Sequence, residues 1–260
     1  MQGDNVDTGK AASKTVGRTG DDEVFLSIII PAYNEQRRLG ASLKEVLGFL
    51  SGQQYIGEVL IVENGSSDNT FEIAQSAARE NPSVRAVREQ RRGKGRAVRR
   101  GMLEARGKYR FLCDADLSMP IDQVNRFLPP ELPDPEVAIA SRGVPGAIVY
   151  NRPAIRALTA KWFNRLTRTI LLPGLKDTQC GFKCFRADVA EFVFGRQVVD
   201  GMAFDAEVLC IARRQGYRIV EVPIPWYFDA DSRVRLITDS ARMALDLLNV
   251  RRNCRRGIYD

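Results

Sequence analysis

The chain has 260 residues, of which 44% are hydrophobic and 27% are charged, a composition typical of soluble globular proteins. It contains no histidine, which excludes imidazole as a general base and excludes a zinc site of the Cys/His kind. The net charge of +7 favours anionic partners: nucleotides, phosphorylated lipids, an anionic membrane surface or nucleic acid. Five scattered cysteines favour free thiols in a reducing cytoplasm over a disulfide framework.

Apolar runs alternate with helical patterns in the first half of the chain. Runs that are apolar at nearly every residue predict strands buried on both faces of a parallel sheet. We expect strands at residues 24–30, where Pro31 stops the strand, at 57–62, at 84–87 and at a run that ends at Asp114, with a helix after each of the first three. This order predicts an α/β protein with a doubly wound, mostly parallel central sheet flanked by helices.

The second half of the chain is less regular. We expect a strand at residues 137–140, an amphipathic helix at 152–172, a helix at 204–215, a strand at 217–222 and a basic helix at 237–253. Residues 1–22 are predicted to form a flexible N-terminal tail, and 23–260 a single domain that ends with the basic helix. No signal peptide is visible and no apolar run could span a bilayer, so we expect a cytoplasmic protein.

Two carboxylates, Asp114 and Asp116, lie where the fourth strand is predicted to end. Strand side chains alternate, so residues two apart share a face. Two close carboxylates repel each other unless a cation lies between them, and hard oxygen ligands suit Mg²⁺ or Mn²⁺. We expect a metal site that also binds a substrate phosphate; the alternative is a helix-capping pair of aspartates.

Three motifs follow the first, second and fourth predicted strands, where ligands bind in such sheets: Pro31-Ala32-Tyr33-Asn34-Glu35, Glu63-Asn64-Gly65-Ser66-Ser67-Asp68 and Asp114-Ala115-Asp116. In this order they resemble the family 2 inverting glycosyltransferases, which have the GT-A (nucleotide-diphospho-sugar transferase) fold. Residues 177–183, Asp-Thr-Gln-Cys-Gly-Phe-Lys, look like the signature of the dolichyl-phosphate or polyprenyl-phosphate glucosyl- and mannosyltransferase branch. The resemblance covers roughly residues 24–255.

The resemblance implies a role for each motif. Asp114 and Asp116 would hold the metal that bridges the two phosphates of a nucleotide sugar. The residues that would bind the nucleotide or its diphosphate are Pro31, Tyr33, Glu35, Glu63, Lys94 and Asp114. Relatives usually carry two aspartates where this chain has Glu63 and Asn64, which puts its base and ribose contacts in question. Gly93-Lys94-Gly95 would let the backbone approach the nucleotide closely, and a solvated basic turn is the alternative.

The resemblance also implies cations near the diphosphate and the acceptor, namely Arg142, Lys183 and Arg233. Asp205 has three possible roles: a base for a hydroxyl acceptor, a residue that positions cations, or a helix N-cap. We take Asp116, Asp205 and Arg142 as the catalytic candidates.

The expected activity is metal-dependent transfer of glucose from UDP-glucose to a polyprenyl or dolichyl phosphate. GDP-mannose is the alternative donor, and a soluble hydroxyl compound the alternative acceptor. The basic helices at 152–172 and 237–256 could rest on the inner face of a membrane, or pack on the core with their charges in water. The basic stretch 85–110 suggests nucleic-acid binding as an alternative. It has almost no aromatic residues on which bases could stack, so we expect no nucleic-acid partner.

Overall fold

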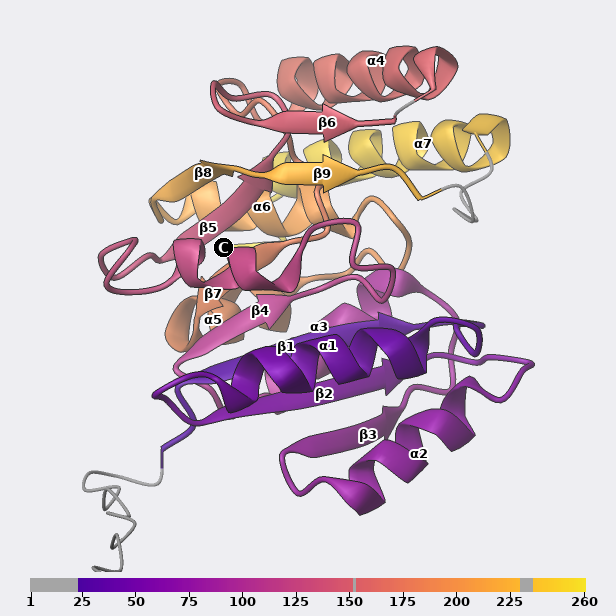
Figure 1. Ribbon diagram of the computed structural model, residues 1–260. Coiled ribbons are helices and arrows are strands. Elements are labelled where there is room, and N and C mark those ends of the chain that lie inside the picture. The colour runs from indigo at the N-terminus through magenta and orange to yellow at the C-terminus, as the bar shows by residue number, and fades with distance from the viewer. Residues whose placement is uncertain (1–22, 152, 230–235) are drawn as a thin grey trace, which may run out of the picture.

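In the computed structural model, a seven-stranded sheet is flanked by helices on both faces (Figure 1). The structure describes residues 23–151, 153–229 and 236–260, so the predicted tail at 1–22 and Arg233 lie outside the described residues. The strands of the large sheet, in spatial order, are β3 (Val84–Arg88), β2 (Gly57–Glu63), β1 (Leu26–Ala32), β4 (Tyr109–Leu112), β7 (Lys183–Arg186), β5 (Val137–Ser141) and β8 (Ile219–Pro223). All neighbouring pairs are parallel except those of β7, which is antiparallel to β4 and β5. The predicted α/β class and mostly parallel sheet are confirmed.

Helices cover the sheet because strand side chains alternate between its two faces. On one face, Ile29, Val62 and Leu112 belong to the core cluster that contains residues of the later helices. On the other, Ile28, Ile61 and Phe111 pack with α1 and the 3₁₀ helix. The helical segments are α1 (Leu39–Ser51), α2 (Thr70–Glu80), α3 (Lys94–Glu104), η1 (Ile121–Phe127), α4 (Ala154–Ile170), α5 (Ala187–Arg196), α6 (Phe204–Arg214) and α7 (Leu236–Arg255).

Two strand ends differ from the prediction in a way that bears on the site. Strand β1 continues through Pro31 to Ala32, because the register with β2 continues there. Strand β4 ends at Leu112, so Asp114 and Asp116 lie in the following turn and not on the strand itself. Strand alternation was therefore the wrong reason for expecting the two carboxylates to lie on one side. Strand β7 and helix α5, which begins at the residue after β7 ends, were not predicted from the sequence.

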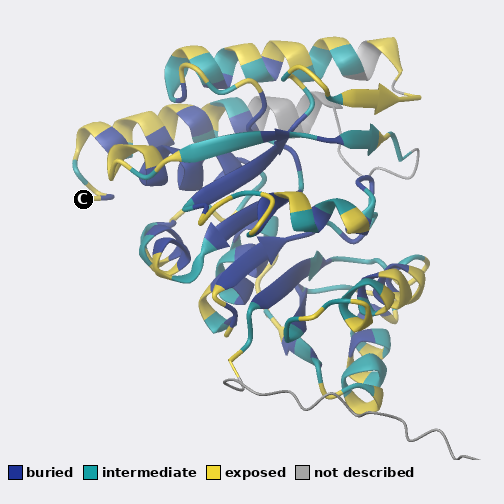
Figure 2. Ribbon diagram, turned by 60° about the vertical axis from the view of Figure 1, so that its left-hand side comes forward, coloured by how far each residue is buried: buried dark blue, intermediate teal, exposed yellow. Residues whose placement is uncertain are grey.

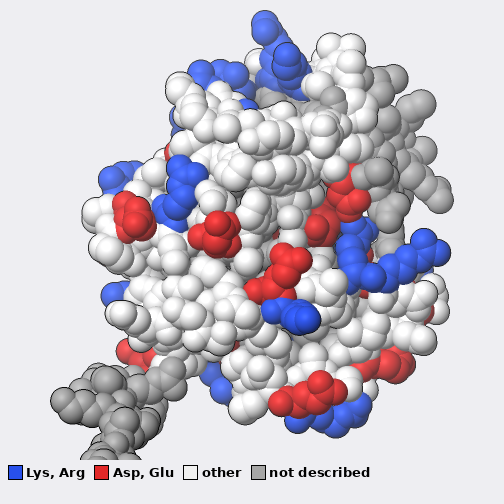
Figure 3. Space-filling view, in the orientation of Figure 1, with Lys and Arg blue, Asp and Glu red and all other residues white. Residues whose placement is uncertain are grey.

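Exposed apolar side chains gather at one end of the molecule, on α4 and on a two-stranded sheet of β6 (Ile148–Tyr150) and β9 (Pro225–Tyr227). Leu158 and Trp162 on α4 are 68% and 58% exposed, so the face of the helix that carries them does not pack on the core, whereas Phe163 on another face does. Figure 2 shows α4 and β6 with much of their length exposed. In Figure 3 the same end shows Lys and Arg side chains at its upper edge above a broad uncharged area.

The cysteines and the helices agree with what the sequence indicated. All five cysteines are buried free thiols, in agreement with the expected absence of a disulfide framework among the described residues. Across the described ranges, no helix has both the length and the apolar character needed to cross a bilayer.

Candidate active site

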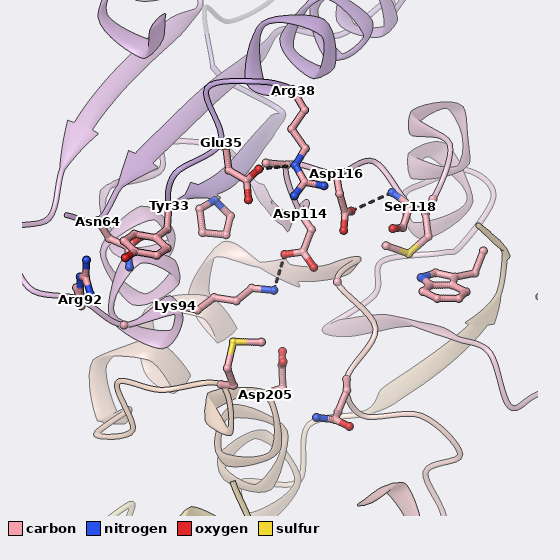
Figure 4. Close-up of a pocket in the computed structure, with 18 of the residues that line it drawn as sticks. Tyr33, Glu35, Arg38, Asn64, Arg92, Lys94, Asp114, Asp116, Ser118 and Asp205 are labelled. Atoms are coloured by element: carbon pink, nitrogen blue, oxygen red, sulfur yellow. Dashed lines mark hydrogen bonds and ion pairs between the residues drawn. The ribbon is translucent and has the colours of Figure 1, made fainter. Parts of the chain in front are cut away.

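A cavity of about 530 Å³ opens at the carboxyl ends of β1, β2 and β4. This is where ligands bind in open α/β sheets, because the strands end there and the loops that follow surround a common space. Residues from all three predicted motifs line it (Figure 4). The predicted site residues in the lining are Pro31, Tyr33, Glu35, Lys94, Asp114, Asp116, Arg142 and Asp205.

Asp114 and Asp116 lie at the centre of the cavity, with Lys94 beside them (Figure 4). Lys94 Nζ is 2.6 Å from Asp114 Oδ1, and Asp116 Oδ1 accepts a hydrogen bond from the Ser118 N–H at 3.0 Å. Burial, and then the carboxylate of Asp114, raise the pKa of Asp116. Burial disfavours the charged form of Lys94, but Asp114 and Asp205 outweigh it and raise the Lys94 pKa. The cavity therefore holds several carboxylates close together, and the ammonium group of Lys94 offsets only part of their negative charge.

The carboxylates of Asp114 and Asp116 fit a divalent cation. In the part of the chain that the structure describes, no cluster of three or more Asp, Glu, Cys or His side chains forms a complete protein cage for a metal. Magnesium is commonly bound by one or two carboxylates together with substrate phosphates and waters. A divalent cation would also offset the repulsion between the two carboxylates, which adds to the effect of burial in raising the pKa of Asp116.

One end of the cavity is formed by Tyr33, Asn64 and Arg92 (Figure 4). The Arg92 guanidinium lies over the Tyr33 ring, 4.9 Å from its centroid. Arg92 was not predicted as a site residue, because a single arginine in a basic stretch carries no recognisable pattern. Arg38 was also missed, because one of its two partners, Asp229, is far away in the sequence; the other is Glu35.

Two predicted residues lie outside the cavity lining. Glu63 is fully buried, and its carboxylate accepts a hydrogen bond from the Ser66 N–H and lies 3.3 Å from Arg88 Nε. These contacts stabilise the turn after β2, and Asn64 lines the cavity in its place. Lys183 is buried beneath Asp205, with its Nζ 2.6 Å from Asp205 Oδ1. Both residues stabilise neighbouring groups, Glu63 the turn after β2 and Lys183 the carboxylate of Asp205. They were predicted to contact a nucleotide or phosphate directly, but neither lines the cavity.

Asp205 is not the N-cap of α6, so that alternative was wrong. The N-cap is Ala203, and Asp205 lies in the first turn of the helix. Its carboxylate faces the cavity opposite Asp114 (Figure 4). Burial raises the pKa of Asp205, although the neighbouring Lys183 and Lys94 oppose this effect.

The segment from residue 177 to 183 contacts two residues that line the cavity, Arg142 and Asp114. Asp177 receives two hydrogen bonds from the Arg142 guanidinium, at 2.6 and 3.0 Å. Burial alone would raise the pKa of Asp177, but Arg142 lowers it to about 2. Gly181 touches Asp114: a Cβ at this position would lie 2.6 Å from Asp114 Cγ. The roles of Asp177 and Gly181 could not be predicted, because their partners are far away in the sequence.

The Gly93-Lys94-Gly95 turn differs from the prediction in what its glycines approach. A Cβ on Gly95 would lie 2.7 Å from Phe204 Cβ and 2.9 Å from the Gly201 carbonyl oxygen, and one on Gly93 would collide with the Asp200 carbonyl. The glycines therefore allow close packing against residues 199–204, and Lys94 reaches the cavity from between them. The arginines of α3 also contact protein groups: Arg96 pairs with Asp200, and Arg99 donates to the Phe194 carbonyl.

Comparison with known proteins agrees with this geometry. The family model "Glycosyl transferase family 2" matches residues 27–194. The chain is 34% identical to a dolichyl-phosphate beta-glucosyltransferase of Saccharomyces cerevisiae over 261 residues, covering 92% of this chain and 78% of the relative. It is 33% identical to the Dictyostelium discoideum protein of the same name, covering 92% and 77%, and 31% identical to the human one, covering 87% and 74%.

Solved structures show the same fold at lower identity. Mannosyl-3-phosphoglycerate synthase from Rubrobacter xylanophilus superposes with a TM-score of 0.65 at 20% identity, covering 90% of this chain and 75% of that one. Glucosyl-3-phosphoglycerate synthase from Mycobacterium tuberculosis, in complex with Mn²⁺ and UDP-glucose, has a TM-score of 0.63 at 18% identity, covering 91% and 80%. The predicted GT-A fold is confirmed. Because the family match spans more than half of the chain, and relatives above 30% identity align over most of their length, the chain belongs to glycosyl transferase family 2.

Proposed function

We propose that this chain transfers glucose from UDP-glucose to dolichyl phosphate or a related polyprenyl phosphate, with a divalent cation bound at Asp114 and Asp116. The observation that carries the proposal is the position of these two carboxylates, with Lys94, at the centre of a cavity of about 530 Å³ at the strand ends. The relatives named dolichyl-phosphate beta-glucosyltransferase favour glucose over mannose and a lipid phosphate over a soluble acceptor.

The cavity has groups suited to each part of a nucleotide sugar. Tyr33 offers an aromatic face and Asn64 an amide at one end, and such groups bind a nucleobase by stacking and hydrogen bonding. The diphosphate would lie at the centre, near Lys94 and Asp114. There the ammonium group of Lys94 would offset the negative charge of the departing UDP. A divalent cation bound there would supply further charge neutralisation.

The acceptor would enter from the side of Arg142 and Trp226, both in the lining. The Arg142 guanidinium lies 5.3 Å from the centroid of the Trp226 ring, and Asp177 fixes its direction. Trp226 belongs to β9, which lies beside the exposed apolar strand β6. The next residue, Tyr227, donates its N–H to the Ser118 carbonyl at 2.8 Å. An apolar surface thus leads directly to the turn of Asp116, as a lipid phosphate requires.

Asp205 has a role that depends on the acceptor. A phosphate monoester has a second pKa near ~6, so it is largely dianionic at neutral pH and attacks without a base. Its oxygen forms the bond to the anomeric carbon from the face opposite UDP, and the bond from that carbon to the UDP oxygen breaks. With such an acceptor, Asp205 positions two cations: Lys183, which donates a hydrogen bond to its carboxylate, and Lys94, whose charge attracts it.

A direct test is transfer by the full chain with Mn²⁺, using UDP-glucose or GDP-mannose as donor. The acceptors are a short polyprenyl phosphate, the matching polyprenol and 3-phosphoglycerate. We expect release of UDP only with UDP-glucose and the lipid phosphate. We expect Asp116→Asn to lower the rate by about 10²-fold or more, because it removes charge from the centre of the site. Transfer from GDP-mannose, or to 3-phosphoglycerate in preference to the lipid, would overturn the proposal.

A further inference from the structure

The carboxylate of Glu207 lies two residues after Asp205 but points away from the cavity, into a buried network of hydrogen bonds. Glu207 is fully buried and does not line the cavity. Its Oε1 accepts hydrogen bonds from the Val198 N–H at 3.1 Å and from the Tyr259 hydroxyl at 2.7 Å, and its Oε2 accepts one from the Val199 N–H at 2.8 Å. Tyr259 is itself buried, and its hydroxyl receives a hydrogen bond from Asn253. Glu207 thus joins the C-terminal residues to the segment before α6.

The segment held by Glu207 packs against the first turn of α3, where Lys94 begins the helix. Gln197 Nε2 donates to the carbonyl oxygens of Gly95 and Val199, at 2.9 and 2.8 Å. The Asp200 carbonyl accepts a hydrogen bond from the Arg96 N–H at 3.3 Å. Both glycines beside Lys94 touch the same segment so closely that neither position has room for a Cβ.

These contacts form a continuous connection from the C-terminus to the cavity. Tyr259 contacts Glu207, Glu207 holds residues 198–199, and residues 197–201 hold the backbone on both sides of Lys94. Lys94 in turn places its ammonium 2.6 Å from Asp114. A shift of residues 197–201 would therefore move Lys94 relative to Asp114.

We propose that Glu207, oriented by Tyr259, is a positioning residue for glycosyl transfer, and that it acts by setting the place of Lys94 beside Asp114. The inference rests on the proposed function, in which Lys94 stabilises the departing diphosphate. Since that charge develops in the transition state, displacing Lys94 lowers kcat more than it weakens ground-state binding of the donor.

The test is a double-mutant cycle between Glu207→Gln and Lys94→Met, measured as kcat and KM for UDP-glucose with the full chain. We expect Glu207→Gln to lower kcat about tenfold, as a misplaced catalytic group would, and to leave KM within about twofold. In the Lys94→Met background the same substitution has no further effect on kcat, because the group that it positions is absent. Tyr259→Phe, which removes only the hydroxyl that contacts Glu207, lowers kcat in the same way but by less.

Tyr217→Phe is the matched control: Tyr217 packs against the same core, and its hydroxyl makes no hydrogen bond with the described residues. We expect it to leave kcat unchanged. Equal losses of kcat from Glu207→Gln with and without Lys94, or a kcat of Tyr259→Phe equal to wild type, would refute the positioning role. If Glu207→Gln does not fold, the double-mutant cycle between Tyr259→Phe and Lys94→Met tests the positioning role in its place. Wild-type kcat in Lys94→Met alone would instead refute the proposed function at Lys94.

Discussion

Gly181 shows how one small residue determines the position of a candidate metal ligand. It lies in the segment below the cavity, and its missing side chain leaves the space that the Asp114 carboxylate fills. A methyl group there would push Asp114 away from Lys94 and out of line with Asp116.

We therefore predict that Gly181→Ala lowers kcat/KM by about 10²-fold, the effect expected for a misplacement of about 1 Å in an active site. The thermal unfolding temperature should change little, because Asp114 is partly exposed and can move. Gly195→Ala is the control, since no atom lies within 4 Å of the position of its Cβ apart from its chain neighbours and the backbone of its own helix. An active Gly181→Ala variant would show that Asp114 need not occupy this position.

Asp177 stabilises the fold through its charge as well as orienting Arg142. Its pKa is lowered to about 2 in the folded state, against an ordinary value of 3.8. A carboxyl group with a lowered pKa contributes stability above its unfolded pKa and loses that contribution as pH falls through the folded pKa. The contribution at neutral pH is about 2 kcal/mol.

The predicted consequence is that Asp177→Asn lowers the free energy of unfolding by at least about 2 kcal/mol at pH 7, since it also leaves Arg142 without its partner. The difference from wild type should shrink as pH falls from 4 towards 2. Urea unfolding across this range measures it. Asp188→Asn, at an exposed partner of Arg186, should have a much smaller effect. A difference that stays constant with pH would contradict the assignment.

At the scale of elements, α4 combines exposed apolar residues with positive charge. Leu158 and Trp162 are more than half exposed, Lys161 and Arg165 are exposed, and the helix has no acidic residue. This combination suits a helix that lies in the interface of an anionic membrane. The proposed lipid acceptor would then be drawn from the surface on which the protein rests.

Binding to vesicles that contain anionic lipid tests this role of α4. We predict that Leu158→Gln and Trp162→Gln each weaken vesicle binding by about tenfold, the loss expected when about 1.4 kcal/mol of apolar contact is removed. Activity on a short, water-soluble polyprenyl phosphate should be unaffected. Leu103→Gln, at a partly exposed position on α3, is the control. Equal binding by all three variants would exclude α4 as the contact.

At the scale of the whole molecule, the cavity proposed to bind the donor joins elements from both halves of the chain. The cavity is lined by residues from the loops after β1, β2 and β4, by Lys94 at the start of α3, and by Gln179, Met202, Asp205 and Trp226 from the second half. A ligand in this cavity contacts both halves and stabilises their association. Ligand binding should therefore raise the stability of the whole fold.

We predict that UDP with Mn²⁺, at about 100 times Kd, stabilises the chain by about 2.7 kcal/mol and raises its unfolding temperature by several degrees. Removing the metal with a chelator should abolish most of the increase, and Asp116→Asn should abolish the part that depends on Mn²⁺. Differential scanning calorimetry measures both effects. An undiminished increase in the presence of chelator would show that nucleotide binding does not involve the cation.

The sequence alone was sufficient for the α/β class, the positions of the first four strands along the chain, and the motifs after β1, β2 and β4. Strand and helix patterns are local, and the ends of parallel strands must meet at one edge of a sheet. The tertiary structure decided which side chains face the cavity and which support it. Glu63 and Lys183 stabilise neighbours, whereas Arg38, Arg92, Gln179 and Trp226 line the space. The antiparallel strand β7, the role of Gly181 and the network around Glu207 depend on partners distant in the chain, whose pairing local sequence does not encode.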